Sequence, residues 1–383
     1  MRQKGSALEE QGTGGRYLRV AASRGASGFA VNRSSRQLLR KVDAVVFDCD
    51  GVLIDARRSY DATIRVVVET MVEELTGVRL RFGRLAPRLI STVRRTGGFN
   101  SDWDTTYALT LFSMVAMEPR RSARGARGPG AAEALANITT GFGSAPRGRG
   151  REAVDSFLDA EFPSLKESLD RSREYLGYPK TPPEGRMTTT FDELYFGASL
   201  FRRVYGARAK NPRAKGLIEL ERTLVSRKTL DSLVKMLGGA RLAMLTGRPF
   251  VGTEHSLGKE VMSCFDRDSS IFIGDADIDP GLRGVYDEYR KPSPKGLIRA
   301  KEKLSSSTLL YVGDSAEDLM MVQNARRRGL DGYLFAGVYQ TSPEPARQVS
   351  FFEKGSSDII IESVNQVPSG LLLQREDVGA GEA

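Results

Sequence analysis

Cysteine and histidine are scarce in this sequence. The two cysteines, Cys49 and Cys264, lie far apart and show no paired ligand spacing, which argues against a zinc site or a disulfide framework. The single histidine, His255, argues against Ser–His–Asp and Cys–His catalysis, because those mechanisms need a histidine base beside the nucleophile. We therefore expect a reducing, cytoplasmic setting.

Long apolar runs are also missing. No uninterrupted apolar run reaches the roughly 18 residues of a membrane span, and the N-terminus has no apolar stretch of the kind found in a secretory signal. We expect no membrane contact. The length of 383 residues suits two domains, at roughly 100–200 residues each. The 40% apolar and 27% charged residues are ordinary for a globular protein.

The positive charge is concentrated in two segments. Residues 1–41 carry a net +7 and residues 119–151 a net +6, so the rest of this +9 chain is mildly acidic at −4. Both segments are rich in Gly, Ser, Ala and Arg, a composition typical of disorder. We predict a disordered extension at 1–40, a flexible loop at 119–151 and a flexible tail at 371–383. A nucleic-acid-binding protein that uses the Arg-rich segments is the alternative from another class.

The apolar pattern predicts an α/β fold. Asp43–Asp48 is a Val-rich run typical of a buried parallel strand, and helical spacing dominates from there to about Gly239. Strands and helices then alternate, with strands expected at 242–245, 271–273, 309–312, 332–335 and 359–361. Such alternation predicts a Rossmann-like, doubly wound parallel sheet. Residues 41–56 and 240–370 would form this core, and 57–239 an inserted helical domain.

Acidic residues follow the first strand. Asp48 and Asp50, at i and i+2 on a strand end, face the same way. Such a pair can divide labour, because one carboxylate can attack while the other transfers protons. Asp50-Gly51 is also a common turn, so this motif is weak evidence by itself.

Three further pieces follow in order along the chain. Thr246-Gly247-Arg248 ends the second strand and could hold phosphate oxygens, although Thr-Gly is also an ordinary turn. Lys291 precedes a helix, where a surface lysine is the usual interpretation. Asp314 and Asp318 follow a strand at a helix start. Two such carboxylates suit Mg²⁺, and equally suit an N-cap with an acid in the first turn.

A second Gly-Asp sequence competes with the last of these pieces. Gly274-Asp275-Ala-Asp277-Ile-Asp279 also ends a strand, but it precedes Lys291 and its acids alternate along an extended chain. We interpret it either as a group at the rim of the site, through Asp275 or Asp277, or as a plain acidic loop.

The four ordered pieces together resemble the haloacid dehalogenase superfamily. They are the DxDG at Asp48–Gly51, the Thr at Thr246, the Lys at Lys291 and the GDxxxD at Asp314–Asp318. The resemblance covers about 43–56 and 240–365, and the insertion is similar to the helical cap of the first subgroup. Within it, Gly97–Asp104 and Phe191–Tyr195 are similar to a little-characterised branch of predicted phosphatases.

The resemblance implies a role for each motif residue. Asp48 would become an aspartyl phosphate, and Asp50 would act as general acid and base. Thr246 would hold the transferring group, and Lys291 would neutralise negative charge. Asp48, the backbone carbonyl of Asp50, Asp314 and Asp318 would bind Mg²⁺. An acid at position 50 also implies phosphoryl transfer, since dehalogenases of this family lack it.

The implied function is a Mg²⁺-dependent phosphatase for a small phosphorylated metabolite. A phosphomutase acting on a sugar phosphate would use the same core, so it remains the alternative within this chemistry. In the cap, Asn100, Asp102 and Trp103 could line the substrate pocket together with Gly247 and Arg248 of the core. A lone Trp is more often a packing residue than a ligand contact, and Arg94 could meet an anionic substrate or solvent.

Overall fold

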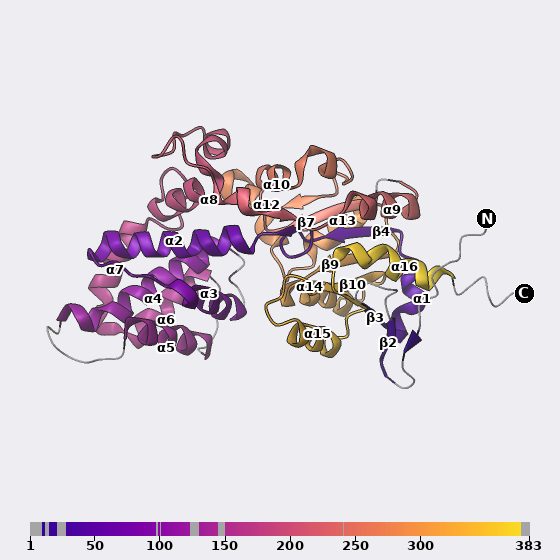
Figure 1. Ribbon diagram of the computed structural model, residues 1–383, viewed down its shortest axis with the longest axis horizontal. Helices are drawn as coiled ribbons and strands as arrows, with labels where there is room; N and C mark the ends of the chain where they lie inside the picture. The colour runs from indigo at the N-terminus through magenta and orange to yellow at the C-terminus, as the bar shows by residue number, and fades with distance from the viewer. Residues whose placement is uncertain are drawn as a thin grey trace, which may run out of the picture. The chain divides into compact units, whose positions relative to one another are not determined.

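The computed structural model describes residues 10–11, 15–20, 28–96, 99, 101–122, 130–144, 150–239 and 241–376. Within it the chain divides into two compact units. The first joins Met1–Ala56 to Arg222–Ala383, and the second is the insertion Arg57–Glu221. Figure 1 labels many of the helices and strands of both units.

The first unit is built on a nine-stranded sheet in the order β1-β2-β3-β11-β10-β9-β4-β7-β8. The six strands from β11 to β8 run parallel, and β3, β2 and β1 continue the edge antiparallel. The bounds are β1 Glu10–Gln11, β2 Tyr17–Val20, β3 Phe29–Asn32, β4 Ala44–Phe47, β7 Leu242–Thr246, β8 Ile271–Phe272, β9 Leu309–Gly313, β10 Tyr333–Val338 and β11 Ile359–Ile361.

The strand order changes direction at β4. The chain passes from β4 outward to β7 and β8, and then returns to the other side of β4 to form β9, β10 and β11. Doubly wound sheets bind ligands at this reversal, beyond the carboxyl ends of the strands. Residues directly after β4 and β9 therefore occupy the favoured place for a site.

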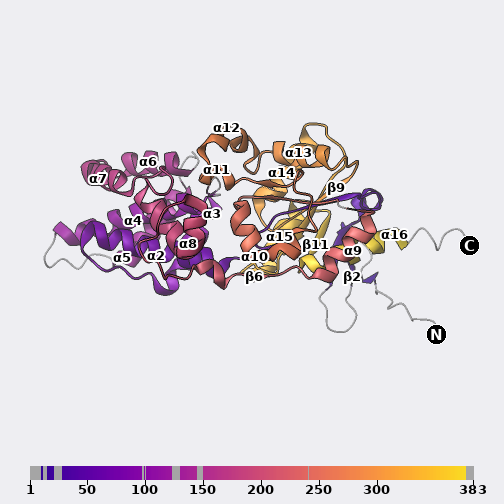
Figure 2. The ribbon, with the colours of Figure 1, turned by 90° about the horizontal axis from the view of Figure 1, so that it is seen from above.

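Helices cover both faces of the sheet. Alternate strand residues such as Val46, Leu245 and Tyr311 pack against Leu297 and Val322 of the helices on one side. In Figure 2, α13 and α14 lie on one side of the strands, and α9 and α10 on the other. The helix bounds are α1 Arg36–Leu39, α9 Arg227–Leu237, α10 Phe250–Met262, α11 Asp275–Ile278, α12 Arg283–Tyr286, α13 Lys295–Lys303, α14 Ala316–Arg327, α15 Pro345–Lys354 and α16 Val367–Glu376.

A two-stranded sheet lies where the chain leaves the first unit and where it returns. Strand β5, Ile54–Asp55, pairs antiparallel with β6, Arg222–Thr223. Leu224 N also donates to Leu53 O at 2.8 Å. The two connections to the insertion thus leave the first unit side by side.

The second unit is helical. Helices α2 and α4 pack on each other through buried apolar residues that include Ile64, Val68 and Leu109. Helix α8 is interrupted at Gly197, which adopts φ 72° and ψ 170°. The bounds are α2 Arg57–Thr76, α3 Ala86–Arg95, α4 Asp102–Ser122, α5 Ala131–Ser144, α6 Gly150–Glu161, α7 Lys166–Leu176 and α8 Arg186–Tyr205.

The N-terminal segment differs from the disordered extension expected at 1–40. Strands β2 and β3 continue the main sheet, with β3 paired to β11, and α1 follows them. Leu18, Val20 and Val31 are buried. Composition misled here, because the stability of these short strands comes from pairing with a sheet edge distant in sequence.

Three other expected boundaries also differ. Helix α5 lies inside the loop expected at 119–151, and its Phe142 packs against the rings of Phe99, Phe112 and Phe157. The insertion ends at Glu221, so α9 belongs to the first unit and not to the expected 57–239 domain. Helix α16 runs to Glu376, into the tail expected from 371.

The sequence analysis predicted no membrane-spanning segment. Among the described residues, no helix is both long enough and apolar enough to cross a bilayer.

Candidate active site

Asp48 stands directly beyond β4. Its backbone N donates to Val312 O at 2.9 Å, which continues the pairing with β9, and its Oδ1 accepts from Cys49 N at 2.7 Å. The side chain is 12% exposed. The carboxylate is therefore held at the carboxyl end of the central strand, open to solvent on a small part of its surface.

A tight turn brings the chain from Asp48 past Asp314. Gly51 adopts φ 76°, and Gly51 N donates to Ile54 O at 2.8 Å. A Cβ on Gly51 would lie 1.9 Å from Asp314 Oδ2. Only glycine satisfies both the left-handed backbone and this close approach.

Asp318 is fixed by the start of α14. Ser315 and Asp318 form a capping box, in which Asp318 N donates to Ser315 Oγ and Ser315 N donates to Asp318 Oδ2, each at 3.1 Å. The Asp318 side chain is fully buried. The N-cap of α14 is therefore Ser315 and not an aspartate, and Asp318 is a buried acid of the first turn whose carboxylate also faces the site.

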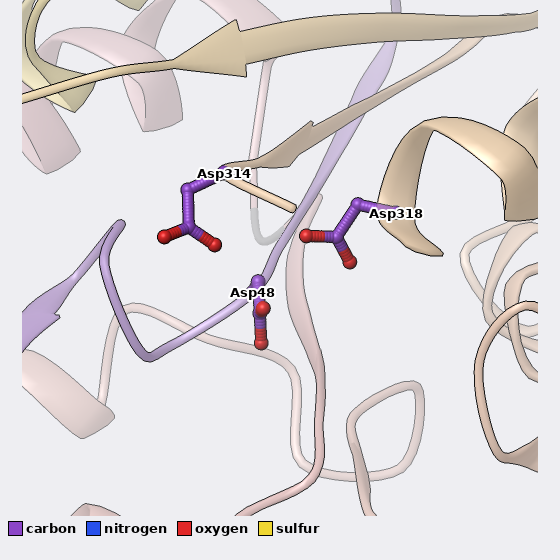
Figure 3. Close-up of side chains that lie close together, drawn as sticks. All are labelled: Asp48, Asp314 and Asp318. Atoms are coloured by element: carbon purple, nitrogen blue, oxygen red, sulfur yellow. The ribbon is translucent and has the colours of Figure 1, made fainter. Parts of the chain in front are cut away.

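Three carboxylates meet at this edge of the sheet. One oxygen each from Asp48, Asp314 and Asp318 lies within 4.8 Å of the others, and Figure 3 shows the three side chains converging. Strands β4 and β9 are neighbours in the sheet, so residues distant in sequence are brought together by the reversal of strand order.

Lys291 is the cation of this cluster. Its Nζ lies 2.8 Å from Asp48 Oδ2 and 2.7 Å from Asp318 Oδ1. Burial opposes its charge, but the two carboxylates outweigh burial and raise the pKa of Lys291 above its usual value. Lys291 is therefore a buried ammonium between two acids, and not the surface lysine of the ordinary interpretation.

The acids are electrostatically crowded. Burial, with Asp318 nearby, raises the pKa of Asp48 to about 7 against the opposing charge of Lys291. Burial and the neighbours Asp318 and Asp48 raise the pKa of Asp314 well above its usual value. Loss of water and repulsion between like charges both favour the neutral acids, so further positive charge here would stabilise the ionised forms.

The donor set fits a hard divalent cation. Mg²⁺ prefers carboxylate oxygens and keeps several waters, so it needs few protein ligands. Both Asp318 oxygens already bind other groups, Oδ1 to Lys291 and Oδ2 to Ser315. Asp48 and Asp314 are therefore the better direct ligands, and Asp318 is better suited to support through Lys291 or through water.

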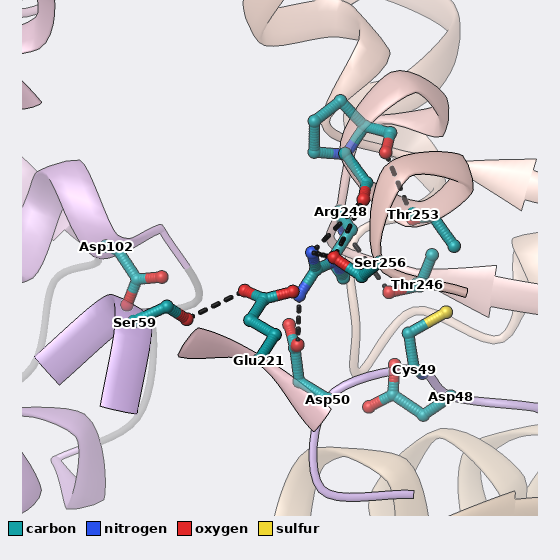
Figure 4. Close-up of polar contacts among 12 residues, drawn as sticks. Asp48, Cys49, Asp50, Ser59, Asp102, Glu221, Thr246, Arg248, Thr253 and Ser256 are labelled. Carbon is teal, nitrogen blue, oxygen red and sulfur yellow. Dashed lines mark hydrogen bonds and ion pairs between the residues drawn. The ribbon is translucent and has the colours of Figure 1, made fainter. Parts of the chain in front are cut away.

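Thr246, Gly247 and Arg248 form the turn after β7. Thr246 is buried and its Oγ1 accepts from Arg248 N at 3.2 Å, while Gly247 is exposed. Arg248 is 1% exposed, and its NH1 lies 2.8 Å from Asp50 Oδ1. This ion pair is drawn in Figure 4. The guanidinium is thus directed at Asp50, a partner that the sequence analysis did not anticipate.

Comparison with known proteins agrees with these motifs. A family model described as haloacid dehalogenase-like hydrolase matches residues 42–326. The chain belongs to this family. No curated protein matches it.

Two solved structures resemble the hydrolase. Northeast Structural Genomics Consortium target ZR25 superposes with a TM-score of 0.54 at 18% identity, over 86% of this chain and 98% of its own. Phosphatase Tt82 from Thermococcus thioreducens gives a TM-score of 0.47 at 24% identity, over 76% of this chain and 90% of its own. The first likeness shows the fold.

Cys49 lies between Asp48 and Asp50 in the DxD motif of this hydrolase. It is fully buried, and burial together with Asp48 raises the pKa of its thiol above the usual value. Because the thiolate is the reactive form of cysteine, Cys49 is a packing residue.

The second Gly-Asp sequence, Gly274–Asp279, contacts the segment that follows β7. Asp275 Oδ1 accepts from Phe250 N at 2.7 Å, at the start of α10. Asp277 pairs with Arg290 at 3.2 Å. Neither belongs to the carboxylate cluster found among the described residues, and Asp275 contributes to the structure around the Thr246–Arg248 turn.

The pocket residues expected in the insertion lie in the second unit. Asp102 pairs with Arg94 at 2.6 Å, and Arg94 also contacts Asp61 at 2.9 Å. Trp103 is buried, and its Nε1 donates to Asp192 Oδ1 at 3.2 Å. Asn100 lies outside the described residues. Arg94 is thus held by acids of its own unit.

Tyr311 is a site residue that the sequence analysis missed. It lies on β9, and its buried hydroxyl is 3.1 Å from Asp318 Oδ1 and 3.0 Å from Leu245 O. A buried tyrosine needs a partner for its hydroxyl, so a Tyr two residues before Gly313-Asp314 was the available signal.

Proposed function

We propose that this hydrolase is a Mg²⁺-dependent phosphatase of a small phosphorylated metabolite, with Asp48 as its nucleophile. The observation that carries the proposal is the position of the Asp48 carboxylate. It lies 2.8 Å from the ammonium of Lys291 and within 4.8 Å of Asp314 and Asp318. A nucleophilic carboxylate needs nearby positive charge to approach an anionic phosphate ester, and Lys291 supplies part of it.

The reaction has two balanced steps. Asp48 attacks phosphorus to form an acyl phosphate while the bond to the leaving oxygen breaks, and Asp50 donates a proton to that oxygen. Water then attacks the acyl phosphate. Asp50 accepts its proton, and inorganic phosphate leaves with Asp48 restored. General acid–base catalysis of this kind typically contributes about 10²–10⁴-fold.

The remaining residues would position the transferring group and neutralise its negative charge. Asp48, the carbonyl of Asp50 and Asp314 would hold Mg²⁺, with Asp318 behind them. When bound, the metal supplies the positive charge that phosphoryl transfer requires. Lys291 stays between Asp48 and Asp318, and Thr246 donates its hydroxyl to an oxygen of the transferring group.

The helical unit is proposed as a cap that contacts the non-phosphate part of the substrate and so selects the substrate. It is inserted between β5 and β6, whose pairing places both connections side by side. Closure of such a unit would exclude water during phosphorylation of Asp48.

Phosphate release from a panel of phosphorylated metabolites tests the proposal. It is measured with Mg²⁺, with chelator and with Asp48→Asn, and Asp231→Asn on the exposed side of α9 is the matched control. We expect release that needs Mg²⁺, survives in the control and disappears in Asp48→Asn. Transfer of phosphate to a second position of a sugar, without release, would support the phosphomutase instead. No reaction by folded protein with Mg²⁺ would overturn both.

A further inference from the structure

Arg248 is a fully buried cation whose guanidinium contacts Asp50. The side chain is 1% exposed, whereas that of Asp50 is 42% exposed. NH1 lies 2.8 Å from Asp50 Oδ1, and NH2 lies 3.2 Å from Ser256 Oγ. Figure 4 shows Arg248 between Asp50 and Ser256. A guanidinium enclosed in this way presents one fixed direction to the carboxylate that it binds.

The turn that carries Arg248 is itself held from several sides. Ile273 N donates to Thr246 O at 2.9 Å, and Asp275 Oδ1 accepts from Phe250 N just after the turn. Gly274 packs directly on the turn, because a Cβ there would lie 2.5–2.7 Å from backbone atoms of Gly247, Arg248 and Pro249. The backbone of Arg248 is therefore held between β8 and α10.

We propose that Arg248 is a positioning residue that fixes the orientation of the Asp50 carboxylate for proton transfer; this rests on the proposed function of Asp50 as general acid and base. Asp50 is the more exposed partner, and the buried guanidinium of Arg248 binds its Oδ1 from a fixed position. Arg suits this role because it stays charged and its planar fork sets direction. A shift of about 1 Å in a reacting group can cost about 10²-fold in rate.

A direct contact between Arg248 and the substrate phosphate is the competing role. It is disfavoured because the guanidinium is buried and already bonded to Asp50, Ser256 and, at 3.5 Å, Gly252 O. The two roles predict different kinetics. A phosphate contact acts on every substrate, whereas a group that orients the general acid matters most when the leaving oxygen needs a proton.

The test combines a double-mutant cycle with a leaving-group comparison. The variants are Arg248→Gln, Asp50→Asn and the pair, and the probes with Mg²⁺ are glycerol 2-phosphate and p-nitrophenyl phosphate. We expect Arg248→Gln to lower kcat/KM for the alkyl ester by about 10²-fold and for the aryl ester much less, because nitrophenolate leaves without a proton. In the Asp50→Asn background, Arg248→Gln should have no further effect.

Milder variants keep the test decisive if Arg248→Gln does not fold. Ser256→Ala removes one bond to Arg248 and should lower kcat for the alkyl ester several-fold, with KM unchanged. Arg248→Lys keeps the charge and should recover part of the loss. Arg227→Gln, an arginine on the surface of α9 with its own acid partners, is the matched control and should match wild type.

Three outcomes would overturn the inference. Equal losses for both esters, whether or not the Asp50→Asn substitution is also present, would make Arg248 a substrate contact. If Ser256→Ala and Arg248→Lys lose the same activity on both esters, and this loss scales with a lowered Tm, Arg248 is a purely structural residue. Wild-type protein that hydrolyses neither ester would remove the proposed function and this inference together.

Discussion

Two carboxylates two residues apart have different cationic partners. Asp48 contacts Lys291, whereas Asp50 contacts Arg248. Asp48 is nearly enclosed, and the Asp50 side chain is 42% exposed. Carboxylates in unlike surroundings can take unlike chemical roles. The proposed division of labour between nucleophile and proton carrier therefore rests on which cation each acid meets and how much water reaches it.

Asp48→Asn should change the pH dependence of stability in metal-free protein. The pKa of Asp48 is raised to about 7 from an ordinary value near 4. An acid whose pKa is raised by folding stabilises the folded state below its unfolded pKa, and this stabilisation is lost as pH rises through the folded pKa. The Tm advantage of Asp48→Asn over wild type should therefore grow from pH 4 to pH 7.

Thermal unfolding of both proteins in chelator, at pH values across that window, measures this difference. Each kcal/mol corresponds to roughly 2–4 °C in a chain of this size class. Asp231→Asn on the exposed surface should show no such trend. A Tm difference that stays constant with pH would contradict the crowding of acids around Asp48.

The candidate site residues could be proposed from the sequence because they lie at or next to element ends in a fixed order. Thr246 ends β7, Asp48 and Asp314 follow strands, and Lys291 precedes α13. The direction of the Arg248 side chain was not predictable, because it depends on packing between β8 and α10. The partners of Tyr311 and Lys291 depend likewise on which strands become neighbours.

The turn between β7 and α10 depends on its contact with the segment after β8. Gly274→Ala would bring a Cβ to 2.5 Å from Pro249 N and 2.7 Å from Arg248 C, and backbone atoms cannot rotate away. Overpacking of this kind costs about 1–3 kcal/mol. We expect a lower Tm and a loss of the proposed phosphatase activity larger than the stability loss explains, since Arg248 moves with the turn.

Gly284→Ala is the matched control for that substitution. A Cβ at Gly284 meets nothing within 4 Å, so both Tm and kcat should stay near the wild-type values. The two variants are compared by thermal unfolding and by hydrolysis of glycerol 2-phosphate, the ester that should depend on Arg248. Full activity in Gly274→Ala would mean that the turn is not held by this contact.

The sequence analysis did not predict α5, β2 or β3, which are short and lie in segments rich in Gly, Ser and Arg. Helix α5 lies in an Arg/Gly-rich region, yet Leu135 and Phe142 are buried. Strands β2 and β3 have four residues each, too few for a pattern to stand out among Gly, Ser and Arg. Strand β3 pairs with β11, far away in the sequence, and α5 packs on the helices α3 and α4 that precede it. Composition reports neither contact.

At the scale of the whole molecule, the N-terminal strands complete the sheet edge. Deleting residues 1–40 removes β2 and β3 and exposes the β11 edge. Burial of Leu18, Val20 and Val31 is also lost, at about 1.5–3 kcal/mol for each large side chain. Because unpaired edges recruit other chains, we expect a lower Tm and larger species in size-exclusion chromatography.

A shorter deletion separates this effect from loss of the residues that precede β1. Removing residues 1–9 leaves every described strand in place and takes away two of the basic residues, Arg2 and Lys4. This variant should keep the Tm and elution volume of the full chain. If the 1–40 deletion behaves in the same way, pairing between β3 and β11 contributes nothing to stability.

Metal binding should couple the site to the stability of the whole core. Burial and the neighbouring acids Asp318 and Asp48 raise the pKa of Asp314 well above its usual value, so its ionised form is disfavoured without a metal. Asp314→Asn should therefore raise the Tm of metal-free protein while abolishing its response to Mg²⁺. Mg²⁺ should instead raise the Tm of wild type. At a hundredfold excess over Kd, the free energy of unfolding should rise by about 2.7 kcal/mol. Thermal unfolding across a Mg²⁺ titration measures both, and an equal rise in the two proteins would place the cation elsewhere.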